Sequence, residues 1–253
     1  MSEKQSFEVK LGNLCNNNCL VCRVLDKRTS ENKSFPKIKK EINQIRKQYS
    51  ELIISGGEPT IRKDIIKIIE HANELKFHHI TLRTNGRMLS YADYCKKIVG
   101  FGIDCFEIYL YGHSSQLHDS ITGVLGSFDQ TIQGIKNLKE LNQYVAANVI
   151  ITEQNYECLS KIVEFLIDLN VDLISLEYVN PKNVSNKNNI VEMSQKLMDE
   201  INKSLDLKFE KYNWSGHIFV KELPAKSSID LKRKYKALDE IKIIKNKFQE
   251  KIK

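Results

Sequence analysis

Long apolar runs are absent from this 253-residue chain. A membrane-spanning helix needs roughly 20 consecutive apolar residues, and no segment approaches that length. The first residues, MSEKQSFEVKLG, also lack the apolar core that a secretory signal peptide carries. The sequence therefore predicts a protein of the cytoplasm without membrane association.

Cysteine is absent from the whole stretch after Cys158. A cysteine-rich metal domain at the carboxyl end would need several thiolate ligands, so it is excluded. The six cysteines that are present are expected to be reduced, because the sequence predicts a reducing compartment. Cys95, within a helical pattern, and Cys105, at the start of a strand pattern, are expected in the core.

An excess of basic over acidic charge is absent except at the carboxyl end. Residues 225–253 hold nine Lys and one Arg against two Asp and two Glu, which is +6 of the chain's net +7. The remainder is close to neutral, which argues against a general nucleic-acid-binding face. We expect residues 225–253 to form a solvated basic helix. A docking surface for an acidic partner, a peptide or a nucleic acid is the alternative.

Strand and helix patterns alternate regularly between residues 7 and 179. Short runs rich in β-branched residues are followed by amphipathic stretches. The predicted strands span 7–11, 51–55, 79–83, 105–111, 145–151 and 173–179, and the predicted helices lie near 38–49, 62–75, 91–99, 128–142 and 156–169. This order predicts an α/β fold with parallel strands and right-handed crossovers. Six such units predict a partial β/α barrel or an open curved sheet.

A polar segment interrupts this order at residues 180–189, NPKNVSNKNN, and is interpreted as a linker. We therefore predict two parts, a core over residues 1–181 and a small extension over residues 182–253. The extension is expected to hold a helix near 191–204, two short strands around LKFEKY and HIFVKE, and the final basic helix.

Three cysteines lie close together in the long loop after the first predicted strand. Cys15, Cys19 and Cys22 form a Cys-x3-Cys-x2-Cys pattern, and no fourth cysteine lies nearby. Three thiolates can hold a soft metal centre and leave one coordination position open for chemistry. A zinc site with a distant fourth ligand is the alternative that spacing alone leaves open.

A second motif, ISGGEPT, covers residues 54–60, between the second predicted strand and a helix. Its two glycines allow the backbone to approach a ligand closely and leave amide groups exposed. Glu58 adds a carboxylate. If the strands are parallel, this motif lies at the same end of the sheet as the cysteines.

These motifs together resemble the radical S-adenosylmethionine (SAM) superfamily. The cysteine trio follows the first strand, Gly-Gly-Glu-Pro follows the second, and Thr84-Asn85-Gly86 follows the third. Residues 110–138 and 149–159 look like the branch that includes peptide- and cofactor-maturing enzymes, here without that branch's auxiliary-cluster domain. The resemblance covers residues 7–181.

The resemblance implies a [4Fe–4S] cluster with three irons held by Cys15, Cys19 and Cys22. The fourth iron would be chelated by the amino and carboxylate groups of SAM. Reduction of the cluster would cleave SAM to methionine and a 5′-deoxyadenosyl radical that abstracts hydrogen from a substrate. The polypeptide would place the substrate and exclude water.

Several side chains are implied to contact SAM. Gly56, Gly57 and Glu58 would receive its ammonium group, which needs acceptors, and Pro59 completes this cofactor-binding motif. The implied contacts on the later strands are Thr84 and Asn85 on the third, Tyr109 on the fourth, and Asn148 on the fifth. Tyr109 stands where relatives commonly have a Ser for the SAM carboxylate. The alternative interpretation of Asn148 is an ordinary polar residue of the strand without a role in binding.

Further candidates surround the expected mouth of the barrel. Cys158 could donate a hydrogen atom, although a buried structural cysteine is the commoner case. His118 and Asp119 are interpreted first as structural, with a side chain bonding its own loop, and proton transfer is the alternative. The remaining mouth candidates are Tyr111, His113, Tyr156 and Glu177.

The leading hypothesis is a single-cluster radical SAM enzyme that modifies a peptide or protein. The same chemistry on a small molecule, nucleotide or cofactor precursor is the first alternative, and a substrate RNA held by residues 225–253 is another. A non-catalytic metal-binding protein is the alternative from another class. The enzyme hypothesis also implies an electron donor such as flavodoxin or ferredoxin.

Overall fold

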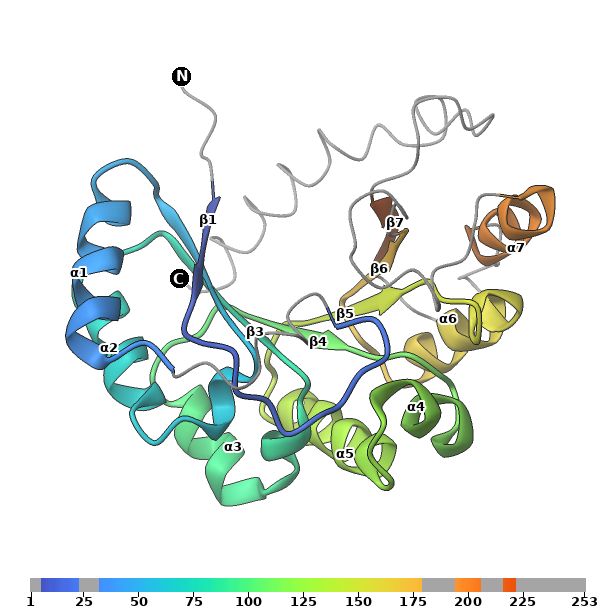
Figure 1. Ribbon diagram of the computed structural model, residues 1–253, viewed down its shortest axis with the longest axis horizontal. Coiled ribbons are helices and arrows are strands. Elements are labelled where there is room, and N and C mark those ends of the chain that lie inside the picture. Colours follow the sequence, from blue (N-terminus) through green and yellow to red (C-terminus); the bar gives the residue numbers. More distant parts are fainter. Residues whose placement is uncertain (1–5, 23–31, 179–193, 206–215, 222–253) are drawn as a thin grey trace.

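The structure is a computed structural model that describes residues 6–22, 32–178, 194–205 and 216–221. Figure 1 shows one curved sheet with the helices arranged along its convex side. The seven strands lie in chain order, β1 to β7, and every neighbouring pair is parallel. The predicted α/β fold of the partial-barrel type is confirmed.

The elements follow one another as strand and helix units. The strands are β1 Ser6–Lys10, β2 Glu51–Ser55, β3 His79–Thr84, β4 Cys105–Tyr109, β5 Val145–Ile150, β6 Leu173–Glu177 and β7 His217–Lys221. The α-helices are α1 Phe35–Arg46, α2 Ile65–Glu74, α3 Ala92–Val99, α4 Ser115–Thr122, α5 Ser127–Glu140, α6 Leu159–Asp168 and α7 Gln195–Leu205. Three short 3-10 helices are η2 Pro59–Ile61, η3 Arg87–Ser90 and η4 Tyr156–Cys158.

The sheet has a seventh strand beyond the six predicted units. Strand β7 comes from the predicted extension, and it pairs with β6 in parallel, with Leu173 opposite His217. The division into residues 1–181 and 182–253 stays a prediction, and β7 shows that part of the extension continues the same sheet. The predicted linker, the LKFEKY segment and the basic helix lie outside the described residues.

Helix α4 differs from the sequence-based expectation, which had a loop after the fourth strand. Its eight residues, SQLHDSIT, are too short and too polar to give a clear helical period. Ser114 caps the helix, because its side chain accepts a hydrogen bond from the Leu117 amide at 3.4 Å. Gly123 ends it in the left-handed region, with φ +67°.

The two faces of the sheet have opposite chemistry because strand residues alternate in direction. Outward residues such as Ile54, Leu82 and Ile108 are fully buried in the main core with the helices. The inner, concave face is polar and charged. Its side chains include Glu8, Ser55, Arg83, Glu107, Asn148 and Ser175. Burying polar and charged groups costs free energy unless they find partners, so an inner face of this kind suits a polar ligand better than a purely structural role.

None of the helices in the described ranges has the length and apolar character that crossing a bilayer requires.

Candidate functional site

The three clustered cysteines lie in the loop that leaves β1 at the carboxyl ends of the parallel strands. In Figure 1 this blue segment runs along the strand ends toward α4. The thiols of Cys15, Cys19 and Cys22 are each half-buried, and none of the six cysteines forms a disulfide. Loops at this end of an α/β sheet are where such folds place their chemistry.

The Gly-Gly turn after β2 packs directly against the cysteine loop. Gly57 donates its amide to the Gly12 carbonyl at 2.8 Å, and Glu58 donates its amide to the Leu14 carbonyl at 2.7 Å. A Cβ at position 57 would lie 2.2 Å from the Leu14 oxygen, so only glycine fits there. The expectation that the glycine amides are exposed to a ligand is therefore wrong for Gly57, because its amide, like that of Glu58, is bonded to the cysteine loop.

The Glu58 carboxylate is buried and surrounded by donors. Its Oε1 accepts hydrogen bonds from the Thr60 amide at 2.9 Å, the Thr60 hydroxyl at 2.5 Å and the Thr84 hydroxyl at 2.6 Å. Its Oε2 accepts the Asn85 amide at 2.7 Å. Burial is the largest influence and raises the pKa of Glu58, while these donors oppose it. Pro59 follows as the first residue of η2 and is buried.

Asn85 connects this carboxylate to the cysteine loop. Its side-chain nitrogen donates to Asn16 Oδ1 at 2.7 Å and points to Cys15 Sγ at 3.9 Å. The Asn17 amide also donates to Cys15 Sγ, at 3.3 Å. Hydrogen-bond donors directed at sulfur favour a thiolate, which is the form that binds metals.

The far side of the cysteine loop is held by Arg87 and by the end of α4. The Arg87 guanidinium donates to the Asn16 carbonyl and to Asn17 Oδ1, the latter at 2.8 Å. The Asn18 amide donates to the Thr122 carbonyl at 2.7 Å, and the Leu20 amide donates to the Ile121 carbonyl at 2.9 Å. No sequence pattern indicates this role of Arg87, because its partners lie about seventy residues away in the chain.

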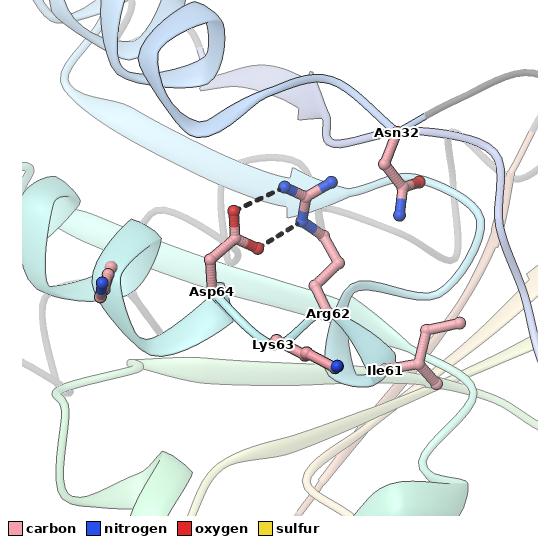
Figure 2. A pocket seen from close by; sticks show the side chains of 6 residues that line it. Asn32, Ile61, Arg62, Lys63 and Asp64 are labelled. Carbon is pink, nitrogen blue, oxygen red and sulfur yellow. Dashed lines mark hydrogen bonds and ion pairs between the residues drawn. The ribbon is translucent and has the colours of Figure 1, made fainter.

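The two stems of the loop are joined by Arg62. Figure 2 shows its guanidinium paired with the Asp64 carboxylate, at 2.9 and 2.8 Å. The same guanidinium donates to the carbonyls of Leu11 and Lys33, both at 3.0 Å, which are the residues on either side of the loop. A surface cavity of about 520 Å³ lies beside this contact, lined by Asn32, Ile61, Arg62, Lys63, Asp64 and Lys67.

Two tyrosines, Tyr109 at the end of β4 and Tyr111 just after it, connect the cysteine loop with the inner face. Tyr111 is buried, packs against Cys19 and hydrogen-bonds its thiol. Burial first, and the neighbouring cysteines second, raise the pKa of Tyr111 well above its usual value. Tyr109 stacks on Tyr111, with ring centroids 6.4 Å apart, and burial raises the pKa of Tyr109 to about 12.

Asn148 lies beside Tyr109 on the inner face, so the structure brings these two predicted residues together. Asn148 Nδ2 donates to Glu177 Oε2 at 2.9 Å, and Tyr109 is a further partner of this side chain. Asn148 Oδ1 and the neighbouring Ser175 hydroxyl are buried without a hydrogen-bond partner. Such atoms are costly in a folded protein unless a ligand or water meets them.

Arg83 carries the positive charge of the inner face. Its guanidinium donates to Glu8 Oε1 at 2.8 Å and to Glu107 Oε2 at 3.1 Å. Burial alone would lower the pKa of Arg83, but the nearby carboxylates hold it above its usual value. The Ser55 hydroxyl completes the group by donating to Glu8 Oε1 at 2.6 Å.

The structural interpretation of the His118–Asp119 pair is confirmed. Asp119 accepts hydrogen bonds from the Gly126 amide, the Ser127 hydroxyl and the Phe128 amide, at 2.7 to 2.8 Å, and so fixes the start of α5. His118 Nδ1 accepts the Tyr111 amide at 3.2 Å. Both residues belong to α4, and neither faces open solvent.

The remaining candidates lie apart from the cysteines. Cys158 ends η4 and packs against the main core, not against the cluster of residues around Cys19. Tyr156 hydrogen-bonds its neighbour Glu157 at 2.8 Å. His113 is half-buried, and burial lowers its pKa. Cys95 and Cys105 are buried, as predicted.

The donor set fits an iron–sulfur cluster better than a single ion. Within the described ranges, no three His, Cys, Asp or Glu side chains converge as one metal ion would require. In a cluster each thiolate binds a different iron, so the sulfur atoms stand apart. A loop held at both stems, with donors directed at Cys15, fits three such ligands.

The sequence model of the radical SAM superfamily matches residues 9–166, which is most of the chain. The chain belongs to the radical SAM superfamily. It is therefore an enzyme chain of the kind that uses a [4Fe–4S] cluster and SAM, as the sequence predicts. Among curated proteins it is similar to probable GTP 3′,8-cyclases. One from Sulfurisphaera tokodaii is 26% identical over 82% of this chain, and one from Saccharolobus islandicus is 27% identical over 70%.

Solved structures confirm the fold of this radical SAM chain. SuiB from Streptococcus suis, bound to SAM, has a TM-score of 0.65 at 19% identity, over 86% of this chain and 50% of that one. The enzyme anSMEcpe with bound SAM has a TM-score of 0.63 at 14% identity, over 84% and 64% of the two chains. The two cyclases are covered over 68% and 58% of their length, so this chain spans only part of its relatives.

Proposed function

We propose that this enzyme abstracts hydrogen from a polar substrate held against the inner face of β4 to β6. One observation carries the proposal. The cysteine loop and the Gly-Gly turn lie together at the carboxyl ends of the strands, and Tyr111 and Tyr109 connect this loop with the unpartnered polar atoms of Asn148 and Ser175 on the inner face. A radical generated at the cysteines would therefore form next to groups that can position a substrate.

The chain's own residues have separate tasks in this proposal. Cys15, Cys19 and Cys22 hold three irons, and the carbonyl oxygens of Gly56 and Gly57 accept the ammonium group of SAM. Those two oxygens accept none of the hydrogen bonds found among the described residues. When bound, the cluster and SAM supply reductive cleavage to methionine and a 5′-deoxyadenosyl radical. The protein contributes position and the exclusion of water.

The inner face also orients polar groups of cofactor and substrate. Asn148 Oδ1 is an acceptor, and the Ser175 hydroxyl can donate or accept, and neither has a partner in the protein. Tyr109 presents a phenol beside them that stays protonated at neutral pH, because burial raises its pKa to about 12. Tyr109 can therefore donate to a carboxylate or ribose oxygen.

A peptide or another amine-bearing molecule is the substrate class that this chemistry favours. The described inner face carries the carboxylates of Glu8 and Glu107, which both pair with Arg83, and that of Glu177 on β6, which accepts a hydrogen bond from Asn148. Two carboxylates against one guanidinium give the group around Arg83 a net negative charge. Negative charge attracts amine and guanidinium groups and repels phosphates.

A nucleotide is the second candidate, and the curated relatives favour it. These relatives are named as GTP 3′,8-cyclases and are 26 to 27% identical to this chain. A triphosphate would need positive charge in addition to Arg83. Lys10 lies on the same side of β1 as Glu8, but the described strands β4 to β6, where the substrate is proposed to lie, carry no Lys or Arg. We therefore rank the nucleotide below the amine-bearing substrate.

Anaerobic reconstitution tests the proposed chemistry. Wild-type protein should bind about four irons per chain and, with dithionite and SAM, should release 5′-deoxyadenosine. Cys19→Ala should abolish this release, whereas Cys95→Ala should keep it, because Cys95 lies in the core. A colourless protein that binds one zinc would contradict the proposal.

Substrate class can be tested with the same assay. A substrate that fits the site should increase the rate of 5′-deoxyadenosine release and should receive or lose a hydrogen isotope. Stimulation by lysine-bearing peptides and not by GTP would support the first candidate. Stimulation by GTP alone would support the second.

We also propose an acidic electron donor of the flavodoxin or ferredoxin kind and a cytoplasmic site of action. The reduced state of all six cysteines supports a reducing compartment. Nucleic acid is a less favoured partner, because the charge excess is confined to residues 225–253, which lie outside the described residues.

A further inference from the structure

We propose that Glu58 is a positioning residue that holds the loop after β3 against the cysteine loop, and that it does not contact the ammonium group of SAM. The inference rests on the proposed function, since it concerns the same SAM site. It separates Glu58 from its neighbours Gly56 and Gly57, to which we assign the ammonium group.

The acceptor capacity of the carboxylate is the first reason. An ionised carboxylate has about four acceptor positions. Four donors of the chain meet Glu58 at 2.5 to 2.9 Å, and they come from Thr60, Thr84 and Asn85. Three of them meet Oε1 and one meets Oε2, so Oε1 is filled and Oε2 keeps one acceptor position. An ammonium group would have to displace a donor from Oε1, which would leave that donor buried without a partner, or pass the enclosing side chains to reach Oε2.

Burial is the second reason. Glu58 is 2% exposed, and Thr84 is equally buried. The Thr84 hydroxyl that donates to Glu58 also accepts the Gly86 amide at 3.1 Å. The carboxylate is therefore enclosed by its own partners on η2 and on the loop after β3, and no side remains open for a ligand.

The route from Glu58 to the cysteines is the third reason. Glu58 fixes the Asn85 backbone, and the Asn85 side chain donates to Asn16 and points to Cys15 Sγ. The Glu58 amide holds the Leu14 carbonyl, immediately before Cys15. One residue thus holds the start of the cysteine loop by its backbone and a neighbouring loop by its side chain.

Two variants and one SAM analogue test this role. Glu58→Gln replaces an acceptor oxygen with a donor and should lower the unfolding temperature of the apo-protein by roughly 3–8 °C. Thr84→Val removes one donor from the same carboxylate and should give a smaller fall of the same kind. If Glu58→Gln does not fold, Thr84→Val alone provides the test. Glu157→Gln, in an exposed ion pair with Lys196, is the matched control.

The affinity ratio between SAM and deamino-SAM identifies the ammonium contact. We expect this ratio, measured by calorimetry on reconstituted protein, to change less than threefold in Glu58→Gln and in Thr84→Val. Loss of tenfold or more of the ratio in Glu58→Gln, with no change in Thr84→Val, would overturn the proposal. An unchanged apo unfolding temperature in both variants would overturn it as well.

The two proposals can fail separately. The apo unfolding temperature needs neither iron nor SAM, so it tests Glu58 as a positioning residue even if the wild-type protein binds no cluster. A wild-type protein without cluster or SAM affinity would contradict the proposed function alone.

Discussion

Two groups of polar side chains differ in their hydrogen-bond partners. One group lies at the ends of β1 to β3, and the other lies on the inner face of β5 and β6. At the ends of β1 to β3, Glu58 and Arg62 each make four hydrogen bonds to the chain itself. On the inner face, Asn148 Oδ1 and the Ser175 hydroxyl have no partner. The first region is organised before any ligand arrives, and the second keeps its hydrogen-bonding capacity for a ligand.

This difference indicates a division of labour within one sheet. A redox cofactor needs ligands that do not move, so the protein fixes the cysteine loop at its stems and at its far side. A substrate that comes and goes needs acceptors and donors that are already desolvated but not yet used. The predictions below test whether the two regions separate in this way.

Removal of Arg62 should have the largest effect on the organised region. Arg62→Met removes the guanidinium that donates to the Lys33 carbonyl and the Asp64 carboxylate, and leaves the Leu11 carbonyl with the Lys33 amide as its remaining donor. We expect a loss of about 2–4 kcal/mol in the free energy of unfolding, together with reduced iron retention. Denaturant unfolding and iron analysis measure the two quantities.

The matched control for Arg62 is Arg46→Met. Arg46 also donates to two carbonyls, those of Leu75 and Lys76, but it lies on α1 away from the cysteines. It should destabilise the protein and leave iron binding intact. Equal iron loss in both variants would mean that the stem contact has no special relation to the cysteine loop.

The pH dependence of stability should report the buried His118 beside the cysteine loop. Burial lowers the pKa of His118 to about 4, while Asp119 opposes the shift and Arg87 supports it. Between its usual pKa of about 6.5 and pH 4, the unfolded chain binds a proton that the folded chain does not. His118 therefore contributes up to about 3 kcal/mol above pH 6.5, and this is lost as the pH falls toward 4.

His118→Gln should flatten this part of the pH profile. Glutamine can still accept the Tyr111 amide but does not titrate. Unfolding by urea at intervals between pH 4 and 7 measures the slope. The same slope in wild type and variant would show that another group controls acid stability.

Ser175→Ala should change stability by less than about 1 kcal/mol, or raise it, because the removed hydroxyl has no partner. On the organised side, Thr84→Val should destabilise the protein, because that hydroxyl has two partners. The Ser175 variant should still weaken substrate affinity by roughly fivefold, equal to about 1 kcal/mol. A clear loss of apo stability in Ser175→Ala would remove the distinction between the two regions.

Tyr111→Phe should have the smallest effect, on the cluster potential. The Tyr111 phenol hydrogen-bonds the Cys19 thiol, and hydrogen bonds to cluster sulfur raise the reduction potential. We expect the midpoint to fall by roughly 20–60 mV. Tyr109→Phe, one ring further from the cysteines, is the control and should leave the midpoint within about 10 mV of wild type. Equal shifts would rule out the sulfur contact as the cause.

The sequence predicted much of the fold because strand and helix periods are local properties. Five-residue runs such as residues 51–55 have the same bounds in prediction and structure. Helix α4 was missed, since Ser115–Thr122 carries few apolar residues and depends on its tertiary packing. Strand β7 was predicted as a short strand, but its pairing with β6 is a long-range contact that local periodicity does not encode.

The candidate site was predictable where spacing carries chemistry, as in Cys15, Cys19 and Cys22. It was not predictable where a single side chain outside any motif contacts the cysteine loop from a distant position in the sequence. Arg62 and Arg87 stand in no motif, and both contact the cysteine loop across many residues of chain. Gly57 was noted for its freedom to approach a ligand, whereas its neighbour is the cysteine loop itself.

Electron paramagnetic resonance of the reduced, anaerobically reconstituted protein tests the central claim most directly. Three cysteine ligands leave one iron open, so addition of SAM should change the signal of the reduced cluster, and Cys19→Ala should remove that signal. A cluster signal that is unchanged by saturating SAM would mean that the polypeptide ligates every iron, and this result would contradict the account.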